Sequence, residues 1–328
     1  MKSICIIGLG PVGTSFGLAL KQTITGKPDI TGFDLKRARA QRAQKAGAIN
    51  KNARDLPSAL KGAELVYIDI PANEIKECLE HVAGSLQGEC IVTDTASTKG
   101  QVIKWAEEIL PPGTSFIGGH PLIGLSISEI QTADPNLFKG QTYCLIPARN
   151  AATGALERMI SLVKRIGASP FLLDAVEHDA FTAGCEHLPL LLSHVLASVT
   201  TRTPAWSEMS GFTTNHYDDF CRPALANPQS IVDICLNNRE GIIRWLDEYI
   251  SELQRLKGLV TAESSGLAQA LEDAHRAIET KLTKGSSAQQ GVISKEDIGG
   301  GMTEMMVGRR MAGRIQRFWK QDREPEKK

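Results

Sequence analysis

The glycine pattern near the N-terminus constrains the fold of this chain more than any other feature. Gly8, Gly10 and Gly13 have the spacing G-x-G-x-x-G, between the apolar run 4–7 and a pattern that predicts a helix over Gly13–Thr23. In this setting the first glycine permits a tight turn, the second lets the backbone approach a pyrophosphate, and the third lets the helix pack closely on the strand. The N–H groups at the helix N-terminus then bind the anion. The sequence therefore predicts a dinucleotide-binding turn made of Gly8, Gly10, Pro11, Val12 and Gly13.

Short strand-like runs alternate with helical patterns over the first half of the chain. The predicted strands are Ser3–Gly8, Ile30–Asp34, Leu65–Ile70, Ile91–Asp94, Ser115–Gly119, Thr142–Pro147 and Phe171–Leu173. Further helical patterns cover Lys36–Ala46 and Ala151–Ile166. Such alternation predicts right-handed βαβ crossovers and a parallel sheet covered by helices on both faces. We therefore expect an N-terminal α/β domain over residues 1–173, a Rossmann-like doubly wound parallel sheet.

After Asp174 the strand signal ends and long amphipathic stretches follow. They cover Glu177–Val199, Ser230–Ile250 with a continuation towards Leu259, and Gly266–Leu282. This pattern predicts an all-α helical domain over 174–283, whose helices bury one face internally and could bury another against a second subunit. Residues 284–328 are expected to be a Gly/Ser-rich linker and a basic C-terminal tail, the basic part being either solvated or a helix docked on a partner.

Composition excludes several classes of function. The 37 Lys and Arg residues balance 37 Asp and Glu residues, which argues against binding to nucleic acid or to an anionic membrane surface. No apolar run is long enough to cross a bilayer, and glycines interrupt the N-terminal apolar stretch, so no signal peptide is expected. The seven cysteines are scattered without C-x-x-C spacing, which fits a reducing cytoplasm and argues against a metal site.

The residue that ends the second predicted strand bears on the choice of cofactor. Asp34 follows Gly13 by 21 residues, where a carboxylate accepts both ribose hydroxyls and repels a 2′-phosphate. This favours NAD. Lys36 and Arg37 would suit a 2′-phosphate instead, so NADP stays open as an alternative.

Polar clusters follow three of the predicted strands, at the sheet edge where α/β proteins bind ligands. They are residues 94–100, residues 118–121, and Pro71 with Asn73, which we assign to the cofactor site. His120 lies in a glycine-flanked turn before a proline, a poor place for core filling. Imidazole groups in general titrate near neutrality, which suits acid–base work on a hydroxyl being oxidised. The alternative is a loop histidine whose imidazole only hydrogen-bonds to the backbone. It is less favoured because the cofactor turn is one strand away.

The motifs at these positions resemble those of the prephenate/arogenate dehydrogenases of tyrosine biosynthesis, over about residues 1–260. The matching segments are DTASTKG (94–100), GGHPLIG (118–124), LFKGQTYCLIP (137–147), EHDAFTAGCEHLP (177–189) and FCRPALANPQSIVDICLNN (220–238). The resemblance implies NAD(P)-dependent oxidative decarboxylation of prephenate or a close analogue such as arogenate. Hydride leaves the ring carbinol carbon, a base takes the hydroxyl proton and CO2 is lost. It also implies a homodimer formed through the helical domain.

The resemblance implies a role for several side chains. His120 is the acid/base, Ser97 orients the hydroxyl or the imidazole, and Lys99 holds its loop or an anionic group. Arg222 clamps a carboxylate of the small-molecule substrate, a role that suits a planar guanidinium.

Other matched positions lie in the helical half. His187 and the pair His178–Asp179 match positions that shape the pocket. Without the resemblance, we would expect these residues on helix surfaces or at helix caps.

The chain departs from the family pattern beside this site. Where many members have Ser-His-x-Pro-His, it has Glu186 and His187 followed by Leu190 in place of the second histidine, and a common tryptophan is Ile231. A carboxylate at 186 would repel a dianionic substrate by roughly 1–4 kcal/mol at 4 Å.

Two explanations of Glu186 remain open. The side chain points away into a cap or salt bridge, or it binds a substrate ammonium such as that of arogenate or 4-amino-4-deoxyprephenate. Two further readings are a dehydrogenase of another hydroxy acid and a non-catalytic NAD-binding regulator.

Overall fold

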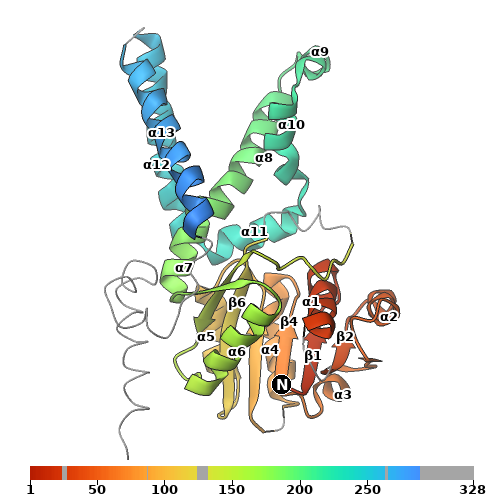
Figure 1. The fold of residues 1–328 in the computed structure, drawn as a ribbon. Helices are drawn as coiled ribbons and strands as arrows, with labels where there is room; N and C mark the ends of the chain where they lie inside the picture. Colours follow the sequence, from red (N-terminus) through yellow and green to blue (C-terminus); the bar gives the residue numbers. More distant parts are fainter. Residues whose placement is uncertain (24–27, 87, 124–131, 263–264, 289–328) are drawn as a thin grey trace, which may run out of the picture.

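The computed structural model describes residues 1–23, 28–86, 88–123, 132–262 and 265–288. The chain forms a sheet domain with helices on both faces, followed by a helical half that stands over one edge of the sheet (Figure 1). This is the fold class predicted from the sequence. The last strand ends at Leu172, and the next helix begins at Ala175 with a capping box formed by Asp174 and Glu177.

The sheet has the strand order β3-β2-β1-β4-β5-β6-β7-β8. The strands are β1 (Ser3–Ile7), β2 (Asp29–Phe33), β3 (Lys51–Asn52), β4 (Leu65–Ile68), β5 (Cys90–Asp94), β6 (Thr114–Pro121), β7 (Thr142–Pro147) and β8 (Ser169–Leu172). The two-residue β3 was not predicted. The expectation of an entirely parallel sheet was also wrong, because β6 and β7 pair antiparallel. Residues 122–141 lack the amphipathic helical pattern that makes the other crossovers, and a parallel pairing needs such a crossover.

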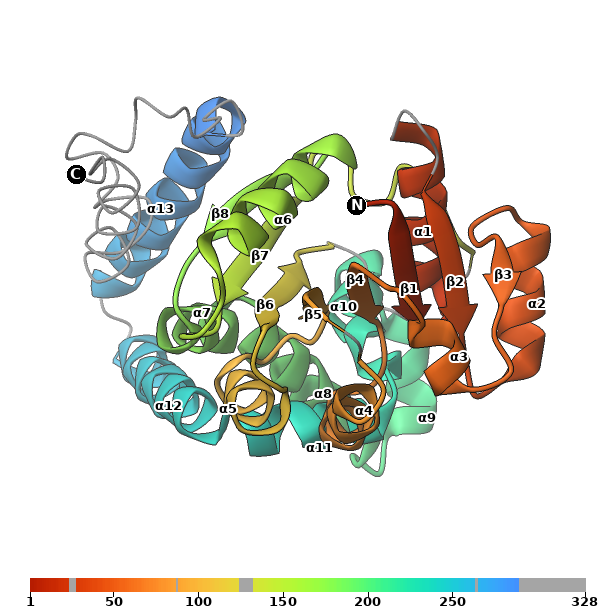
Figure 2. The ribbon, with the colours of Figure 1, turned by 90° about the horizontal axis from the view of Figure 1, so that it is seen from below.

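Side chains alternate between the two faces of the sheet, as a strand period of two requires. Ile4 and Ile6 belong to one buried apolar cluster with side chains of α1 (Pro11–Thr23), α2 (Arg37–Lys45) and α6 (Thr153–Arg165). Cys5 and Ile7 belong to a second buried cluster with side chains of the helices on the other face (Figure 2), namely α3 (Leu56–Leu60), α4 (Ile75–Ala83) and α5 (Gly100–Ile109). Both faces of β1 are therefore buried, which explains its continuous apolar run.

The helical half contains more breaks than its sequence pattern predicted. The first stretch is divided into α7 (Ala175–Thr182), a π-helical segment η2 (Ala183–His187) and α8 (Leu188–Thr201), and the second into α11 (Pro228–Asn237) and α12 (Arg239–Thr261). Shorter elements between them are α9 (Trp206–Met209), η3 (Ser210–Phe212), α10 (Asn215–Cys221) and η4 (Arg222–Leu225). The last helix, α13 (Gly266–Ala288), includes the start of the expected linker, and the expected basic tail lies outside the described residues.

The helical half meets the sheet domain at the carboxyl ends of the strands. Helix α11 packs against η1 (Ala72–Glu74), which follows β4, and α7 packs against α5. Beyond this junction α8 with α10 forms one arm and α12 with α13 a second (Figure 1). Within the described residues, no helix is long and apolar enough to cross a bilayer.

Candidate active site

His120 lies in a strand and not in the turn that the sequence suggested. It is the penultimate residue of β6, opposite Cys144 of β7, and only 4% of it is exposed. The preceding glycine is needed for packing, since a Cβ on Gly119 would lie 2.5 Å from the carbonyl oxygen of Asp94. Gly119 therefore allows β5 and β6 to approach closely, and β6 places the imidazole at the carboxyl edge of the sheet.

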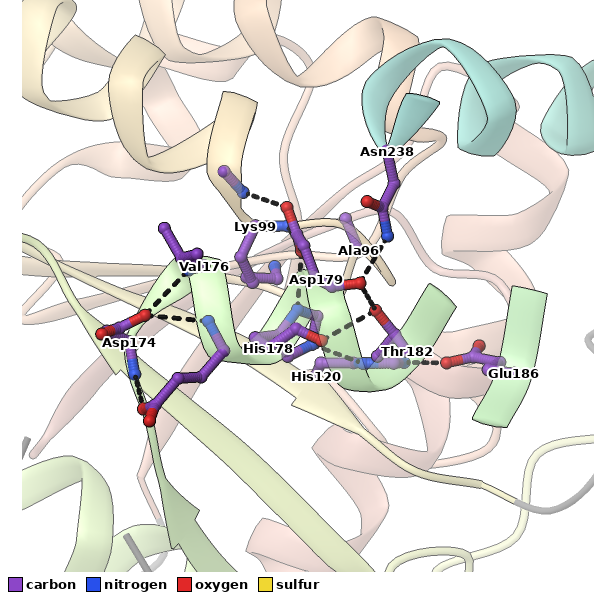
Figure 3. Close-up of polar contacts among 12 residues, drawn as sticks. Ala96, Lys99, His120, Asp174, Val176, His178, Asp179, Thr182, Glu186 and Asn238 are labelled. Carbon is purple, nitrogen blue, oxygen red and sulfur yellow. Dashed lines mark hydrogen bonds and ion pairs between the residues drawn. The ribbon is translucent and has the colours of Figure 1, made fainter. Parts of the chain in front are cut away.

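A chain of side chains extends from His120 into the helical half (Figure 3). Nδ1 of His120 lies 2.9 Å from Nε2 of His178, and Nδ1 of His178 lies 2.8 Å from a carboxylate oxygen of Asp179. Desolvation lowers the pKa of His178 to about 4, so this imidazole is neutral near pH 7.

These contacts assign the tautomers of both imidazoles. His178 donates its Nδ1–H to Asp179, so its Nε2 accepts a hydrogen bond from Nδ1–H of His120. Nε2 of a neutral His120 then carries a lone pair. The arrangement prepares that nitrogen to act as a base.

Asp179 also holds the two halves of the chain together. Its carboxylate oxygens accept hydrogen bonds from the backbone N–H groups of Lys99 and Gly100, both at 2.7 Å, at the start of α5. Asp179 is thus a helix cap, but of a helix in the sheet domain. The expectation of a helix-surface position is wrong for its neighbour His178, which is 1% exposed.

Lys99 is fully buried and forms an ion pair with Asp94. The same carboxylate accepts hydrogen bonds from the backbone N–H groups of Ala96 at 3.0 Å and Gly119 at 3.2 Å. The pair therefore joins the 94–100 loop to β6 next to His120. Of the two roles considered for Lys99, holding its loop fits this position, because its ammonium already pairs with a buried carboxylate.

Glu186 points at the catalytic candidate. Its Oε2 lies 3.5 Å from Nε2 of His120, and its side chain is 43% exposed (Figure 3). Desolvation raises the pKa of the Glu186 carboxyl, but the His120 imidazole outweighs this effect, so the pKa lies below its usual value and the group is ionised. Of the two explanations for Glu186, an orientation away from the site is therefore wrong.

The π-helical segment that carries Glu186 is held in place by α12. A Cβ on Gly184 would lie 2.5 Å from the ring of Trp245, so this position has room only for glycine. His187, at the end of the segment, is fully buried and lies beside the backbone of Ser97. The half-buried Ser97 itself belongs to the loop between β5 and α5. Segments with this wide helical turn are frequent at functional sites.

The dinucleotide turn has the geometry expected of it. Gly8 has φ of +89°, and a Cβ there would lie 1.9 Å from the carbonyl oxygen of Asp69. A Cβ on Gly13 would lie 2.1 Å from the carbonyl oxygen of Gly8, so the helix packs closely on the strand. At Gly10 the nearest atom would be 3.8 Å away, which leaves the space in front of this backbone open for a pyrophosphate. The carboxylate of Asp34 accepts a hydrogen bond from the backbone N–H of Leu9 at 2.8 Å.

The other expected cofactor residues lie around the same edge. Pro11 and Val12 begin α1, Pro71 precedes η1, and Asn73 is exposed within it. The turn therefore presents the backbone and the carboxylate that bind a dinucleotide in this fold.

Sequence profiles of one family match most of the chain. A profile described as prephenate dehydrogenase, nucleotide-binding domain, matches residues 16–172, and one described as prephenate dehydrogenase, dimerization domain, matches residues 174–273. The prephenate dehydrogenase of Bacillus subtilis (strain 168) is 31% identical over 269 residues, which cover 80% of this chain and 71% of that protein. The chain belongs to the prephenate dehydrogenase family.

Solved structures of family members have the same fold. The prephenate dehydrogenase of A. aeolicus, in complex with hydroxyphenyl propionate and NAD+, gives a TM-score of 0.79 at 23% identity and covers 85% of this chain and 98% of that one. The Synechocystis arogenate dehydrogenase gives 0.68 at 23% identity, covering 87% and 99%. The family predicted from the motifs is thus confirmed, and the chain is a dehydrogenase of this family with a nucleotide-binding domain.

In this family member, Arg222 does not lie deep in the site. Its guanidinium donates to the carboxylate of Asp219 at 2.7 Å, and its side chain is 52% exposed. It begins η4, which packs on α8, the helix that follows Glu186 and His187. A substrate carboxylate would share this guanidinium with Asp219 or compete with it.

Sequence reasoning missed two residues that hold the site. Asn238, at the break between α11 and α12, donates to the carbonyl oxygen of Asp179 at 2.7 Å and lies 3.3 Å from Nδ1 of His187. Asp69, after β4, accepts from Gly13 N–H at 2.7 Å and from the Thr95 hydroxyl at 2.8 Å. The sequence signal for Asp69 was its place after an apolar strand. For Asn238 it was a polar residue inside a long helical pattern.

Proposed function

We propose that this member of the prephenate dehydrogenase family uses NAD to oxidise and decarboxylate prephenate or a close analogue, with His120 as the acid/base. The observation that carries the proposal is the hydrogen-bonded chain from Asp179 through His178 to His120, which leaves a lone pair on Nε2 of His120. The names of the relatives support the class of substrate, since they include prephenate, arogenate and cyclohexadienyl dehydrogenases.

The residues of this chain account for the proton transfer. The bound nicotinamide supplies the acceptor for the hydride from the ring carbinol carbon. Nε2 of His120 takes the hydroxyl proton, and the imidazolium that forms is stabilised by the Nδ1 hydrogen bond to His178. Loss of the ring carboxylate as CO2 then completes the aromatic ring.

Three further side chains complete the proposed site. Ser97 orients the substrate hydroxyl or the imidazole, and His187 fixes the shape of the pocket next to it. Arg222 binds a substrate carboxylate after exchange with Asp219, which uses the bidentate geometry of a guanidinium.

Turnover on a panel of acids tests this proposal. Prephenate, arogenate and 4-amino-4-deoxyprephenate are offered with NAD and, in parallel, with NADP, and formation of the reduced cofactor is followed. Reduction of NAD by at least one of the three acids is expected, with NAD preferred because of Asp34. Binding of NAD without reduction by any of them would favour the non-catalytic regulator.

Replacing Gly10 with alanine tests the cofactor site separately. The new methyl group would meet no protein atom closer than 3.8 Å, so the thermal midpoint of unfolding should be nearly unchanged. It would stand where the pyrophosphate approaches the backbone, and we expect the Kd for NAD to rise by about 10-fold or more. Isothermal titration measures the affinity. An unchanged Kd would place the pyrophosphate elsewhere.

The helical half has the surface of a subunit interface, and we propose that two copies of the chain pair through it. All the exposed large apolar side chains of the described residues lie in this half, except Leu35 and Leu122. Those on α12 and α13 include Ile250, Leu253 and Ile278, each about half exposed. Such a surface is seldom left in water, and the family profile matching this region is described as a dimerization domain. Residence in the cytoplasm stays a prediction from the sequence.

Aspartate at both Ile250 and Leu253 should dissociate this dimer. Each apolar side chain contributes about 1.5–3 kcal/mol when buried, and a symmetric interface loses every contribution twice. Light scattering should show twice the mass of one chain for the unmodified protein and the mass of one chain for the variant. Leu35→Asp is the matched control, since it removes an exposed leucine of the sheet domain. A monomeric unmodified protein would contradict the proposal.

A further inference from the structure

Two hydrogen-bond acceptors face each other across the candidate active site. Nε2 of His120 and Oε2 of Glu186 are 3.5 Å apart. The proton of the neutral His120 imidazole lies on Nδ1, where His178 accepts it. A lone pair and a carboxylate oxygen therefore meet with no proton between them, and this arrangement requires a donor from a ligand or a second proton on His120.

The number of hydrogens on the reacting group of the substrate decides which ligand fits. A hydroxyl has one O–H bond, so a hydroxyl that donates to His120 turns its oxygen lone pairs towards the carboxylate of Glu186. A primary ammonium has three N–H bonds and can donate to both acceptors at once. It also brings a positive charge to the carboxylate.

Among the described residues, the ion-pair partner of the Glu186 carboxylate is His120, and that pair needs a protonated imidazole. The pKa of His178 is about 4, and desolvation also lowers the pKa of His187, so both imidazoles are neutral near pH 7. The Lys99 ammonium pairs with Asp94. A protonated His120 would compensate the charge, but its Nε2 would then be occupied and unable to act as a base.

The backbone holds Glu186 at this place. The residue belongs to the π-helical segment η2, which Trp245 of α12 packs against at Gly184, where a Cβ would lie 2.5 Å from the indole ring. The side chain is 43% exposed, so a substrate entering from solvent can reach it.

We propose that Glu186 selects a cyclohexadienyl acid that carries a protonated primary amine, in place of a hydroxyl, on the ring carbon that loses hydride. This inference rests on the proposed function, since it uses the same hydride-transfer site. Glu186 accepts hydrogen bonds from the ammonium, and Nε2 of His120 takes one proton from it, which leaves a free amine.

The rest of the reaction balances. The C–H bond of the amine-bearing carbon breaks, and its electron pair leaves as hydride to NAD+. The bond between the ring and its carboxylate breaks as well, and that electron pair completes the aromatic ring. The products are a 4-aminophenyl acid, CO2, NADH and the proton held by His120.

Three acids that differ in the position of the amine test this inference. Prephenate has a ring hydroxyl and no amine, arogenate has a ring hydroxyl and an ammonium on its side chain, and 4-amino-4-deoxyprephenate has the amine on the ring. We expect the unmodified enzyme to show a kcat/KM for the ring amine about 10- to 100-fold above that for prephenate, the range of a charged hydrogen bond.

The variant Glu186→Gln tests the assignment to this residue. It should lower kcat/KM for the ring amine by about 10- to 100-fold and leave kcat/KM for prephenate equal or higher. Glu208→Gln is the matched control, since it removes a carboxylate from the exposed helix α9, where Ser207 is its partner, and should change neither value. Circular dichroism verifies the fold of both variants.

Each other outcome overturns the inference. An equal loss with the ring amine and with prephenate would mean that Glu186 only positions His120. A loss confined to arogenate would place the carboxylate at the side-chain ammonium. Turnover of prephenate with rejection of the ring amine would overturn the inference and leave the proposed function intact, whereas reduction of NAD by none of the acids would overturn both.

Discussion

Replacing His120 with asparagine is expected to lower turnover by about 10²–10⁴-fold, because the variant removes the base that receives the substrate proton. An asparagine amide can still donate to Nε2 of His178, so β6 and the helical half remain joined. Loss of the base is thereby separated from loss of structure. Steady-state formation of NADH measures the effect.

The affinity for NAD gives the internal control for this variant. The glycine turn is built from other strands, so the Kd for NAD should change by less than about threefold. His81→Asn, on the exposed face of α4, removes a histidine whose imidazole contacts only the backbone of its own helix among the described contacts, and it should leave turnover unchanged. Near-normal turnover of the His120 variant would remove this imidazole from the mechanism.

The order of the elements was predictable because it depends on local patterns. The glycine turn, the strand–helix alternation and the change to helices after Asp174 each follow from apolar spacing within one segment. The position of His120 within a strand was not predictable in this way. Gly118 and Gly119 look like turn residues in sequence, and only the approach of the Asp94 carbonyl shows that the strand needs a glycine at 119.

The breaks in the helical half were missed for a related reason. Residues 177–199 keep an apolar pattern through the π-helical segment, so the sequence reads as one helix. The wide turn there is fixed by Trp245 packing over Gly184, a contact between distant segments. The direction of Glu186 therefore could not be deduced from the sequence, although its presence beside the site could.

The pair His178–Asp179 shows what tertiary contacts add to a motif. In the sequence they are two consecutive polar residues within a predicted helix. In the fold Asp179 caps α5, 80 positions before it, and His178 lies between that carboxylate and His120. Contacts of this kind join residues far apart in the sequence, so no local sequence pattern can predict them.

Replacing Asp179 with asparagine is expected to lower turnover by about 10²–10⁴-fold near pH 7, by reversing the tautomers of both imidazoles. The carboxylate accepts the Nδ1–H of His178, whereas an amide nitrogen at this place donates. His178 would then carry its proton on Nε2 and donate it to Nδ1 of His120. The His120 proton would move to Nε2, the atom that must receive the substrate proton.

Asp179 also caps α5, so stability must be measured beside turnover. Asparagine accepts one of the two backbone N–H groups instead of both, which should destabilise the fold by about 1 kcal/mol. His178→Leu removes the imidazole between Asp179 and His120 but keeps the Asp179 carboxylate that caps α5. This variant should therefore lower turnover and leave the contribution of the α5 cap to stability unchanged. If Asp179→Asn lowers the midpoint and leaves kcat unchanged, the carboxylate is only a cap. Suppose instead that both variants lower kcat and that their pH profiles lose the limb that reports the base. The Asp179 carboxylate then determines, from the helical half, which nitrogen of His120 carries the proton, and catalysis depends on the two halves being joined at this point.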